Sequence, residues 1–143
     1  MAYTYQYPRP SVTVDCVIFL KEDNAHKVLL IKRGHYPFEG QWAFPGGFVE
    51  MDETLSASAR RELEEETGLK NIELEQMYTF GDPGRDPRGR TIAVVHYGFT
   101  HPGNAAVKGG DDASEARWFD LDDLPELAFD HDKIMKMAIE KLI

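Results

Sequence analysis

Residues 47–69 read GFVEMDETLSASARRELEEETGL, and this stretch decides the fold and most of the function. It joins a glycine-rich turn at Gly47 to a run in which Leu55, Ala59 and Leu63 recur every fourth position. That repeat is typical of the buried face of a helix. The same run carries many carboxylates, and hard divalent cations choose such oxygen ligands while they bridge phosphate oxygens. The stretch therefore predicts a helix that holds metal ions against a polyphosphate.

The two ends of this helix are marked by capping residues. Asp52 and Thr54 are both plausible N-caps, because their side-chain oxygens can accept hydrogen bonds from the first free backbone N–H groups. Gly68 suits the left-handed backbone position that follows many helices. We therefore expect a helix over residues 53–67, approximately.

Three glutamates of this helix, Glu62, Glu65 and Glu66, fall within about a third of its circumference, and that arc overlaps the apolar stripe. Like charges there would repel, and burial would raise their pKa values, unless a cation compensates them. Arg61 precedes Glu65 by four residues and can hold a carboxylate in place. A Glu-rich helix is often just a solvated face, so the wider pattern must decide between the two interpretations.

Length and composition restrict the class of protein. With 143 residues, of which 42% are hydrophobic and 29% charged, the chain is expected to form a single domain over residues 1–143. The sequence shows neither an apolar membrane span nor a secretory signal, so we expect no membrane partner and a cytoplasmic location. The single cysteine, Cys16, lies in an apolar run and is expected to be a buried core residue.

The net charge of −9 disfavours binding to nucleic acid, because proteins that bind the phosphate backbone need a basic patch. A small phosphorylated ligand is still compatible with this charge if metal ions neutralise both the ligand and the carboxylates that hold it. An acidic site for an acidic substrate therefore implies metal.

The remaining elements follow from residue types along the chain. Segments rich in β-branched and apolar residues predict strands, and clusters of Gly and Pro predict loops. We expect strands at residues 11–20, 27–33, 72–80, 91–100 and 115–119, a second helix at 130–142, and irregular loops at 36–47 and 81–89. Strands and helices are mixed, so the fold class is α/β or α+β, with one sheet packed against helices.

The central segment resembles the Nudix box in full. That box is a glycine, five residues, a glutamate, seven residues, Arg-Glu, an aliphatic residue, any residue, Glu-Glu, any residue, a glycine and an aliphatic residue. The positions are filled by Gly47, Glu53, Arg61, Glu62, Leu63, Glu65, Glu66, Gly68 and Leu69. The flanking segments QWAFPGG, residues 41–47, and EARWF, residues 115–119, also look like this family. Nudix hydrolases cleave a diphosphate linked to another group by metal-assisted attack of water on phosphorus.

The resemblance implies a fold and a metal site. The fold would be an α/β/α sandwich around a mixed sheet. The metal ligands would be Glu62, Glu65, Glu66 and the Gly46 carbonyl, with Glu53 and Arg61 supporting them, and the metal would be Mg²⁺ with Mn²⁺ as the alternative. The same three glutamates were nominated above by helix geometry.

The general base is less narrowly defined by the resemblance. In some relatives a glutamate of the box accepts the proton of the attacking water, which here would be Glu62. In others a residue on a later loop does so, and here Asp111, Asp112 and Glu115 stand where that loop would be. We rank Asp112 first among these and Glu115 second.

The expected substrate comes from the segments around the box. Features of residues 33–42, Pro83 some fifteen residues beyond Gly68, and the Asp-Pro-Arg-Gly loop before a strand resemble the ADP-ribose pyrophosphatase branch. That branch implies a nucleoside diphosphate sugar as substrate. Arginines fork onto phosphate oxygens and aromatic rings stack on bases, and Tyr36 could take part in stacking. The candidate substrate-binding residues are Arg33, Phe38, Trp42, Arg85, Arg88 and Arg90.

Two other functions share these features. A hydrolase of oxidised nucleoside triphosphates would have the same box, and a catalytically silent, ligand-binding regulator could use the same fold. We expect the regulator to be disfavoured, because the box is intact and no DNA-binding domain is apparent in the sequence. Relatives of this branch often pair, so the resemblance also allows a homodimer. Three histidines, His35, His96 and His131, are not spaced as metal ligands and receive no role.

Overall fold

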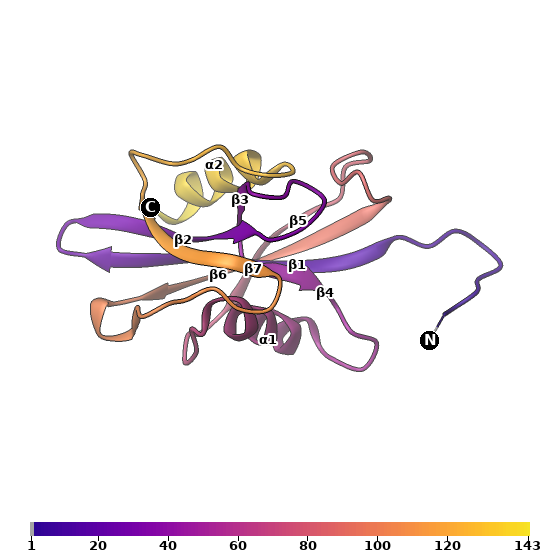
Figure 1. Cartoon of the computed structure of the whole chain (residues 1–143), viewed down its shortest axis with the longest axis horizontal. Coiled ribbons are helices and arrows are strands. Elements are labelled where there is room, and N and C mark those ends of the chain that lie inside the picture. The colour runs from indigo at the N-terminus through magenta and orange to yellow at the C-terminus, as the bar shows by residue number, and fades with distance from the viewer. Residues whose placement is uncertain (1) are drawn as a thin grey trace.

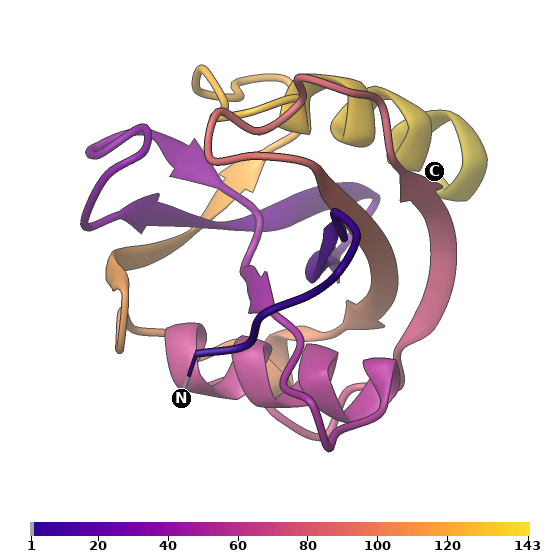
Figure 2. The ribbon, with the colours of Figure 1, turned by 90° about the vertical axis from the view of Figure 1, so that its right-hand side faces the viewer.

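Seven strands form one mixed sheet that lies between two helices in the computed structural model, which describes residues 2–143 (Figure 1). The view in Figure 2 shows α1 and α2 on opposite faces of the sheet. The expected α/β/α sandwich is therefore confirmed. The strands are β1 (Ser11–Glu22), β2 (Ala25–Arg33), β3 (Trp42–Ala43), β4 (Gly46–Phe48), β5 (Glu75–Phe80), β6 (Thr91–Thr100) and β7 (Ala113–Asp120), and the helices are α1 (Leu55–Thr67), η1 (Pro102–Asn104, 3₁₀) and α2 (His131–Leu142).

Strand β1 is the centre of the sheet. It runs parallel to β6 over its first ten residues and antiparallel to β2 and β4. Strands β5 and β7 close the sheet as antiparallel partners of β6 and β2. The two helices cover the two faces of the sheet, where their apolar sides are buried.

The sheet divides where β1 and β2 separate. The two strands pair over Phe19–Glu22 and Ala25–Val28, close to their hairpin. Beyond that point, β2 pairs with the short strand β3, while β1 pairs with β4. The chain between β2 and α1 therefore enters the sheet at the division and passes directly to α1. This arrangement opens the sheet at one end and positions the site described below.

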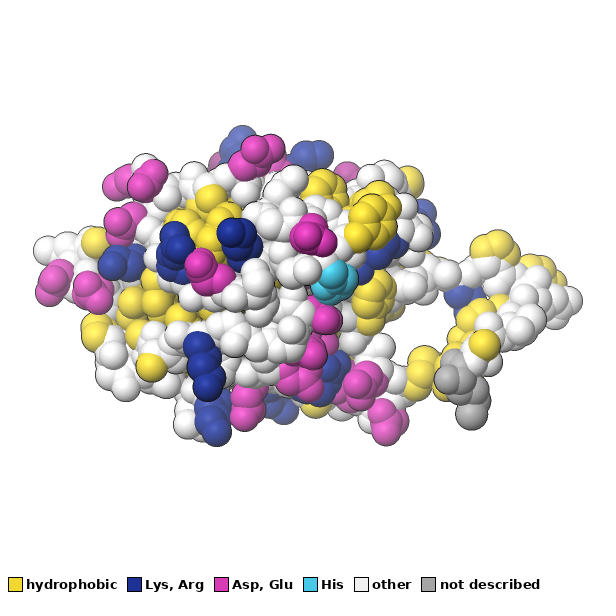
Figure 3. Space-filling model, in the orientation of Figure 1, with side chains coloured by type: hydrophobic (Ala, Val, Ile, Leu, Met, Phe, Trp, Pro, Cys, Tyr) yellow, Lys and Arg dark blue, Asp and Glu magenta, His cyan; other side chains and the backbone are white. Residues whose placement is uncertain are grey.

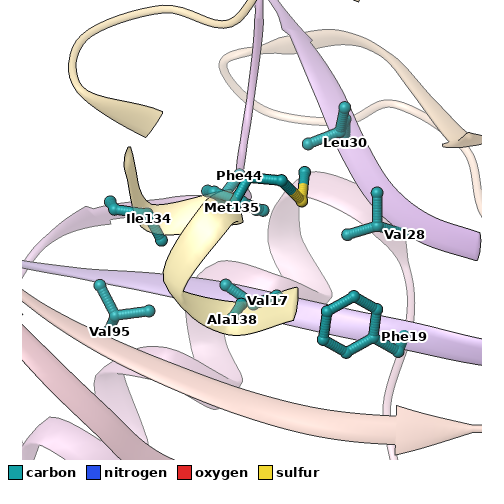
Figure 4. Close-up of a cluster of buried hydrophobic side chains, with 9 residues drawn as sticks. All are labelled: Val17, Phe19, Val28, Leu30, Phe44, Val95, Ile134, Met135 and Ala138. Atoms are coloured by element: carbon teal, nitrogen blue, oxygen red, sulfur yellow. The ribbon is translucent and has the colours of Figure 1, made fainter. Parts of the chain in front are cut away.

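The two faces of β1 supply two separate hydrophobic cores, because successive side chains of a strand point in opposite directions. Val17 and Phe19 pack with Ile134 and Ala138 of α2, as Figure 4 shows. Cys16 and its even-numbered neighbours pack on the other face with Ala59 and Leu63 of α1. The expectation that Cys16 is buried is confirmed, and its Sγ lies 3.5 Å from the carbonyl oxygen of Ala59.

Helix α1 has the ends that its capping residues predict. Thr54 is the N-cap, and its Oγ1 accepts the backbone N–H of Ala57 at 3.1 Å, so Thr54 rather than Asp52 is the cap. Gly68 ends the helix with a left-handed φ of 77°.

Two expected boundaries need correction. Residues 36–47 were expected to be irregular, but Trp42–Ala43 and Gly46–Phe48 form strands because β1 and β2 offer free edges where they separate. The strand expected from residue 72 begins at Glu75, because Ile72 instead turns its side chain into the core under α1. Within residues 2–143, no helix is long and apolar enough to cross a membrane.

Candidate active site

Strand β4 lies directly against α1, and two glycines allow this contact. Glu66 Oε1 accepts the backbone N–H of Gly46 at 2.7 Å. A Cβ on Gly47 would come within 2.5 Å of the carboxyl carbon of Glu62, and a Cβ on Gly46 would meet the backbone carbonyl oxygen of Val14. Neither position can hold a larger residue without displacing its neighbours, so the glycines set the distance between the strand and the two carboxylates.

Arg61 connects three carboxylates. Its Nε and Nη2 donate to the two oxygens of Glu53, at 3.0 and 2.6 Å. Its Nη1 donates to Glu62 at 2.8 Å and to Glu65 at 3.2 Å. The guanidinium beside Glu53 lowers the pKa of that carboxyl to about 2, so Glu53 stays ionised and continues to hold the arginine. The structure thus brings together the box residues that the sequence nominated.

The three glutamates differ in burial. Glu62 and Glu66 are 8% and 5% exposed, whereas Glu65 lies on the solvent side of α1 with 43% of its side chain exposed. Burial raises the pKa of Glu66 to about 8 and also raises the pKa of Glu62. Two buried carboxylates with raised pKa values form a site that a cation would stabilise.

The donor set fits a hard divalent cation that is shared with its substrate. Among residues 2–143, no three His, Cys, Asp or Glu side chains converge to hold a metal by themselves. A protein site for Mg²⁺ usually supplies one or two carboxylates and leaves other positions to phosphate and water. Glu62 and Glu66, with the backbone of Gly46 beside them, match that kind of site.

A cleft of about 380 Å³ opens beside these carboxylates, at the division of the sheet. Figure 3 shows acidic side chains gathered over β4 and the segment that leads into α1. The walls come from segments that are far apart in the sequence, including the 81–89 loop and the start of α2. Its polar and aromatic lining includes Asp15, Arg33, Phe48, Glu62, Glu66, Arg85, Asp86, Arg88, Asp112, Phe129 and His131.

The floor of the cleft is formed by Asp15 of β1 and His131 of α2. His131 Nδ1 accepts the backbone N–H of Phe44 at 3.1 Å, and its Nε2 lies 3.8 Å from Asp15 Oδ2. Burial lowers the pKa of His131 to about 3, so the ring is neutral at physiological pH. Burial also raises the pKa of Asp15, to about 7. Both side chains are therefore largely buried, and both line the cleft.

Four of the six candidate substrate residues lie at the cleft or contact its wall. Arg33 lines the cleft, with its guanidinium 5.0 Å from the centre of the Phe129 ring. Phe38 contacts the same ring edge-on, with 4.8 Å between ring centres. Phe38 and Phe129 both have left-handed backbones, with φ of 60° and 54°, which are unusual for aromatic residues and mark a constrained segment.

The two cleft arginines of the 81–89 loop, Arg85 and Arg88, differ in how much of the side chain is exposed. Arg85 forks onto Asp130 at 2.9 and 2.7 Å, and its side chain is 5% exposed. Arg88 also forks onto one carboxylate, since its Nε and Nη2 donate to Asp86 at 3.1 and 2.7 Å, but 32% of its side chain is exposed. Its guanidinium also lies 4.8 Å from the centre of the Phe48 ring. Arg88 is therefore the more accessible of the two to a ligand, whereas Arg85 is buried in its ion pair.

Two candidate substrate residues lie elsewhere. Trp42 packs edge-on against Phe119 at 4.8 Å, beneath the guanidinium of Arg117. Arg90 donates to the carbonyl oxygen of Gly81 at 2.8 Å. Neither side chain lines the cleft, because β3 turns Trp42 toward the core under α2 and Arg90 lies at the far end of its loop.

The two candidate loop bases are separated by the structure. Asp112 lines the cleft at its rim, next to the start of β7. Glu115 lies outside the cleft and pairs with Arg117 at 2.8 Å. Asp112 lies in the turn before β7, whereas Glu115 lies within the strand, so the two carboxylates are directed to different surroundings. The arrangement favours Asp112 over Glu115.

Several cleft residues received no role in the sequence-based expectations. Asp15 lies within an apolar strand, and an acidic residue among apolar neighbours was the signal that could have revealed it. His131, Asp86 and Phe129 carry no comparable signal, since each enters the site only through contacts between distant segments.

Comparison with known proteins identifies related sequences. A family model described as the NUDIX domain matches residues 9–138. An ADP-ribose pyrophosphatase of Methanocaldococcus jannaschii is 48% identical over 130 residues, which cover 91% of this chain and 73% of that protein. The ADPR responsive transcriptional repressor NtrR of Acinetobacter baylyi is 36% identical over 140 residues, which cover 95% of this chain but 56% of the repressor. This chain thus spans little more than half of that regulator.

Solved structures share the fold. A MutT/nudix family protein from Enterococcus faecalis superposes with a TM-score of 0.89 at 33% identity, covering 99% of this chain and 65% of that protein. The NUDIX domain of Shewanella oneidensis NrtR, determined as a complex with ADP ribose, superposes with a TM-score of 0.88 at 34% identity. That superposition covers 96% of this chain and 91% of the domain.

Proposed function

Because the chain belongs to the Nudix family of hydrolases, we propose that it cleaves ADP-ribose, or a closely related nucleoside diphosphate sugar, to AMP and a sugar phosphate. In the ADP-ribose case the second product is ribose 5-phosphate. The oxygen of one water molecule bonds to one phosphorus atom, and the bridging oxygen leaves with the other phosphate.

One observation carries this proposal: a single cleft joins the buried pair Glu62 and Glu66 to an exposed arginine, Arg88, and to the rings of Phe48 and Phe129. The carboxylates suit a metal-bound diphosphate, the guanidinium suits a phosphate oxygen, and the rings suit a planar base. The 48% identical ADP-ribose pyrophosphatase and the domain bound to ADP ribose support the same substrate class.

The chain uses divalent metal ions as a Nudix hydrolase, and we propose Mg²⁺ with Mn²⁺ as a substitute. A divalent ion held by Glu62, Glu66 and the Gly46 carbonyl, with Glu65 at the solvent side, would polarise the phosphoryl oxygens and acidify the attacking water. Arg61 keeps Glu62 and Glu65 in position through its hydrogen bonds to both.

For the proton of the attacking water, we propose Asp112 as acceptor. It is the loop carboxylate that lines the cleft, and its exposure at the rim allows the proton to pass to solvent after each turnover. Glu62 is the alternative acceptor, although Arg61 already donates to one of its oxygens at 2.8 Å. A cytoplasmic location and the absence of a nucleic-acid partner complete the proposal and stay predictions.

The proposal is tested by a substrate panel with the purified chain. ADP-ribose, other nucleotide sugars and both normal and oxidised nucleoside triphosphates are incubated with Mg²⁺ or Mn²⁺, and AMP release is measured by chromatography. We expect kcat/KM for ADP-ribose to exceed that for any triphosphate by about tenfold or more. Turnover of triphosphates without turnover of nucleotide sugars would replace this function with nucleotide sanitation.

The related repressors support a second function for this chain, the binding of ADP-ribose without hydrolysis. The NrtR domain was determined with ADP ribose, and the 36% identical NtrR is named as an ADPR responsive repressor. If this chain bound ADP-ribose in calorimetry but released no AMP with either metal, a ligand-binding regulator would be the better description. The intact set of Glu53, Arg61, Glu62, Glu65 and Glu66 argues for catalysis instead.

A further inference from the structure

Asp15 and His131, at the floor of the cleft, have polar atoms that the protein itself does not use. Their exposed fractions are 8% and 3%. Within residues 2–143, neither carboxylate oxygen of Asp15 accepts a hydrogen bond, and His131 Nε2, at 3.8 Å from Oδ2, is too far away to donate one. Among these residues the only fully buried side-chain polar atom without a partner is Ser58 Oγ, so the unpaired oxygens of Asp15 open onto the cleft, where a ligand can reach them.

The other nitrogen of His131 determines what its ring offers. Nδ1 accepts the backbone N–H of Phe44 at 3.1 Å, and a nitrogen that accepts carries no hydrogen. The hydrogen of the neutral ring is therefore on Nε2, which faces Asp15. The floor of the cleft thus presents one acceptor, the Asp15 carboxylate, and one donor, the His131 Nε2–H.

This pairing of donor and acceptor selects among ligands. When Asp15 is ionised, its carboxylate repels a phosphate oxygen, and a cation would meet the Nε2–H of His131. A hydroxyl group can donate to the first residue and accept from the second. Space is also limited, since a Cβ on Gly46 would already lie 2.4 Å from Asp15 Oδ1. A small polar group fits there better than a planar base, for which Phe48 and Phe129 offer stacking faces.

We propose that Asp15 and His131 bind the vicinal hydroxyl groups of a ribose in the substrate, with Asp15 accepting from one hydroxyl and His131 donating to its neighbour. This assignment rests on the proposed function, because a nucleoside diphosphate sugar supplies the ribose. The position agrees, since Asp15 faces Gly46 in the β1–β4 register and Gly46 donates to Glu66. Strand β4 alone therefore separates Asp15 from Glu66. A diphosphate beside Glu66 would place its attached sugar within reach of Asp15.

The test compares variants on substrates that differ by one hydroxyl. Wild type, Asp15→Asn and His131→Gln are assayed with ADP-ribose and with deoxy analogues that lack the 2- or 3-hydroxyl of either ribose. Wild type should lose roughly 10- to 100-fold in kcat/KM on the deoxy analogues of one ribose, the usual effect of unpairing a buried polar group. Asp15→Asn should lose a similar factor on ADP-ribose and then distinguish it poorly from those analogues. The affected analogue identifies which ribose is bound.

A matched control and two further readouts separate this role from others. His96→Gln changes a buried histidine that lies outside the cleft, so it should keep the wild-type preference for hydroxyls. Thermal unfolding shows that each variant is folded. If Asp15→Asn discriminates among the analogues as wild type does, the inference is wrong. It is also wrong if that variant changes only the metal concentration needed for half-maximal rate. The same holds if the variant still distinguishes the deoxy analogues but no longer distinguishes adenine from hypoxanthine.

Failure of the proposed function would be recognised separately. If wild type releases no AMP from ADP-ribose, the hydrolytic proposal fails on its own. Calorimetric titration of ADP-ribose into wild type and Asp15→Asn in the presence of Mg²⁺ then tests the hydroxyl site directly. A dissociation constant roughly tenfold or more higher in the variant supports the site, and equal or undetectable binding overturns it.

Discussion

Arg61 and Glu53 form a two-pronged ion pair in which Nε donates to Oε2 at 3.0 Å and Nη2 donates to Oε1 at 2.6 Å. Glu53 is fixed in turn by the backbone N–H of Glu50, which donates to its Oε1 at 3.0 Å. The remaining nitrogen of Arg61 reaches Glu62 and Glu65. The orientation of two candidate metal ligands therefore depends on one guanidinium and the carboxylate that anchors it.

Replacement of Arg61 by lysine should disturb this orientation without removing the positive charge. An ammonium group cannot fork onto Glu53 and still reach Glu62. We expect Arg61→Lys to lower kcat by roughly 10- to 100-fold and to raise the metal concentration for half-maximal rate. Arg60→Lys is the matched control, because Arg60 is exposed and donates to Ser56 Oγ on another face of α1. Equal kinetics in both variants would remove the supporting role from Arg61.

Replacement of Glu66 by glutamine should separate activity from stability. The amide oxygen can still accept the N–H of Gly46, but the side chain can no longer ionise to bind a metal ion. We expect Glu66→Gln to lower kcat by about 100-fold or more. In metal-free buffer the variant should unfold at the same temperature as wild type or higher, because it buries no carboxylate. Glu64→Gln, on the exposed face near Lys70, is the control, and a matching loss of activity there would contradict a specific metal site.

We expect substitutions of the two loop carboxylates, Asp112 and Glu115, to differ in their effect on kcat. If Asp112 accepts the proton from water, Asp112→Asn should lower kcat by roughly 100-fold or more with little change in KM. Glu115→Gln removes a carboxylate that pairs with Arg117 outside the cleft, so its kcat should fall far less. Steady-state kinetics with saturating metal compares them. A larger loss in Glu115→Gln would mean that the loop rearranges when substrate binds.

A methyl group on Gly47 should act directly on the carboxylate beside it. The added Cβ would lie 2.5 Å from the carboxyl carbon of Glu62, so that side chain must move. We expect Gly47→Ala to reduce kcat by roughly tenfold or more while the fold persists. Gly81→Ala is a suitable control, since a Cβ there meets Ile92 at an ordinary 3.8 Å. Unchanged activity in Gly47→Ala would show that the position of Glu62 is not critical.

The buried histidine predicts a change of stability with acid. Burial lowers the pKa of His131 from 6.5 to about 3, so between these values the unfolded chain binds a proton that the folded chain does not. The stability that neutral His131 contributes is present above pH 6.5 and is lost as the pH falls below it, by about 1 kcal/mol per pH unit. Urea unfolding of wild type and His131→Gln at several pH values measures it. A stability difference that stays constant with pH would show that His131 is protonated in the fold.

Helix α1 and the position of its candidate metal ligands could be predicted because the information for both is local. The apolar repeat, the caps Thr54 and Gly68, and the spacing of the glutamates all lie within one short segment. The orienting contact between Arg61 and Glu65 is likewise set by helix geometry, which places residues four apart side by side. Local signals of this kind do not depend on how the rest of the chain folds.

The rest of the cleft depends on contacts that the sequence does not encode locally. Asp15 and His131 are 116 positions apart and meet because β1 and α2 pack at one end of the sheet. The same is true of Arg85, whose guanidinium the structure commits to Asp130. Trp42 was a stacking candidate by residue type, but the short strand β3 directs its ring toward Phe119. Residue type was enough to select these side chains as candidates. Only the tertiary fold shows which of them line the cleft.

The placement of Cys16 allows its reactivity to report on the motion of α1. Its thiol is buried beneath α1, with Sγ 3.5 Å from the Ala59 carbonyl oxygen, and it is the single cysteine in the sequence. A thiol reagent can react there only when α1 lifts from the sheet or the chain unfolds. The labelling rate of the native chain therefore measures how often the glutamate helix opens, and its slowing by added cation would report how firmly the ion closes it.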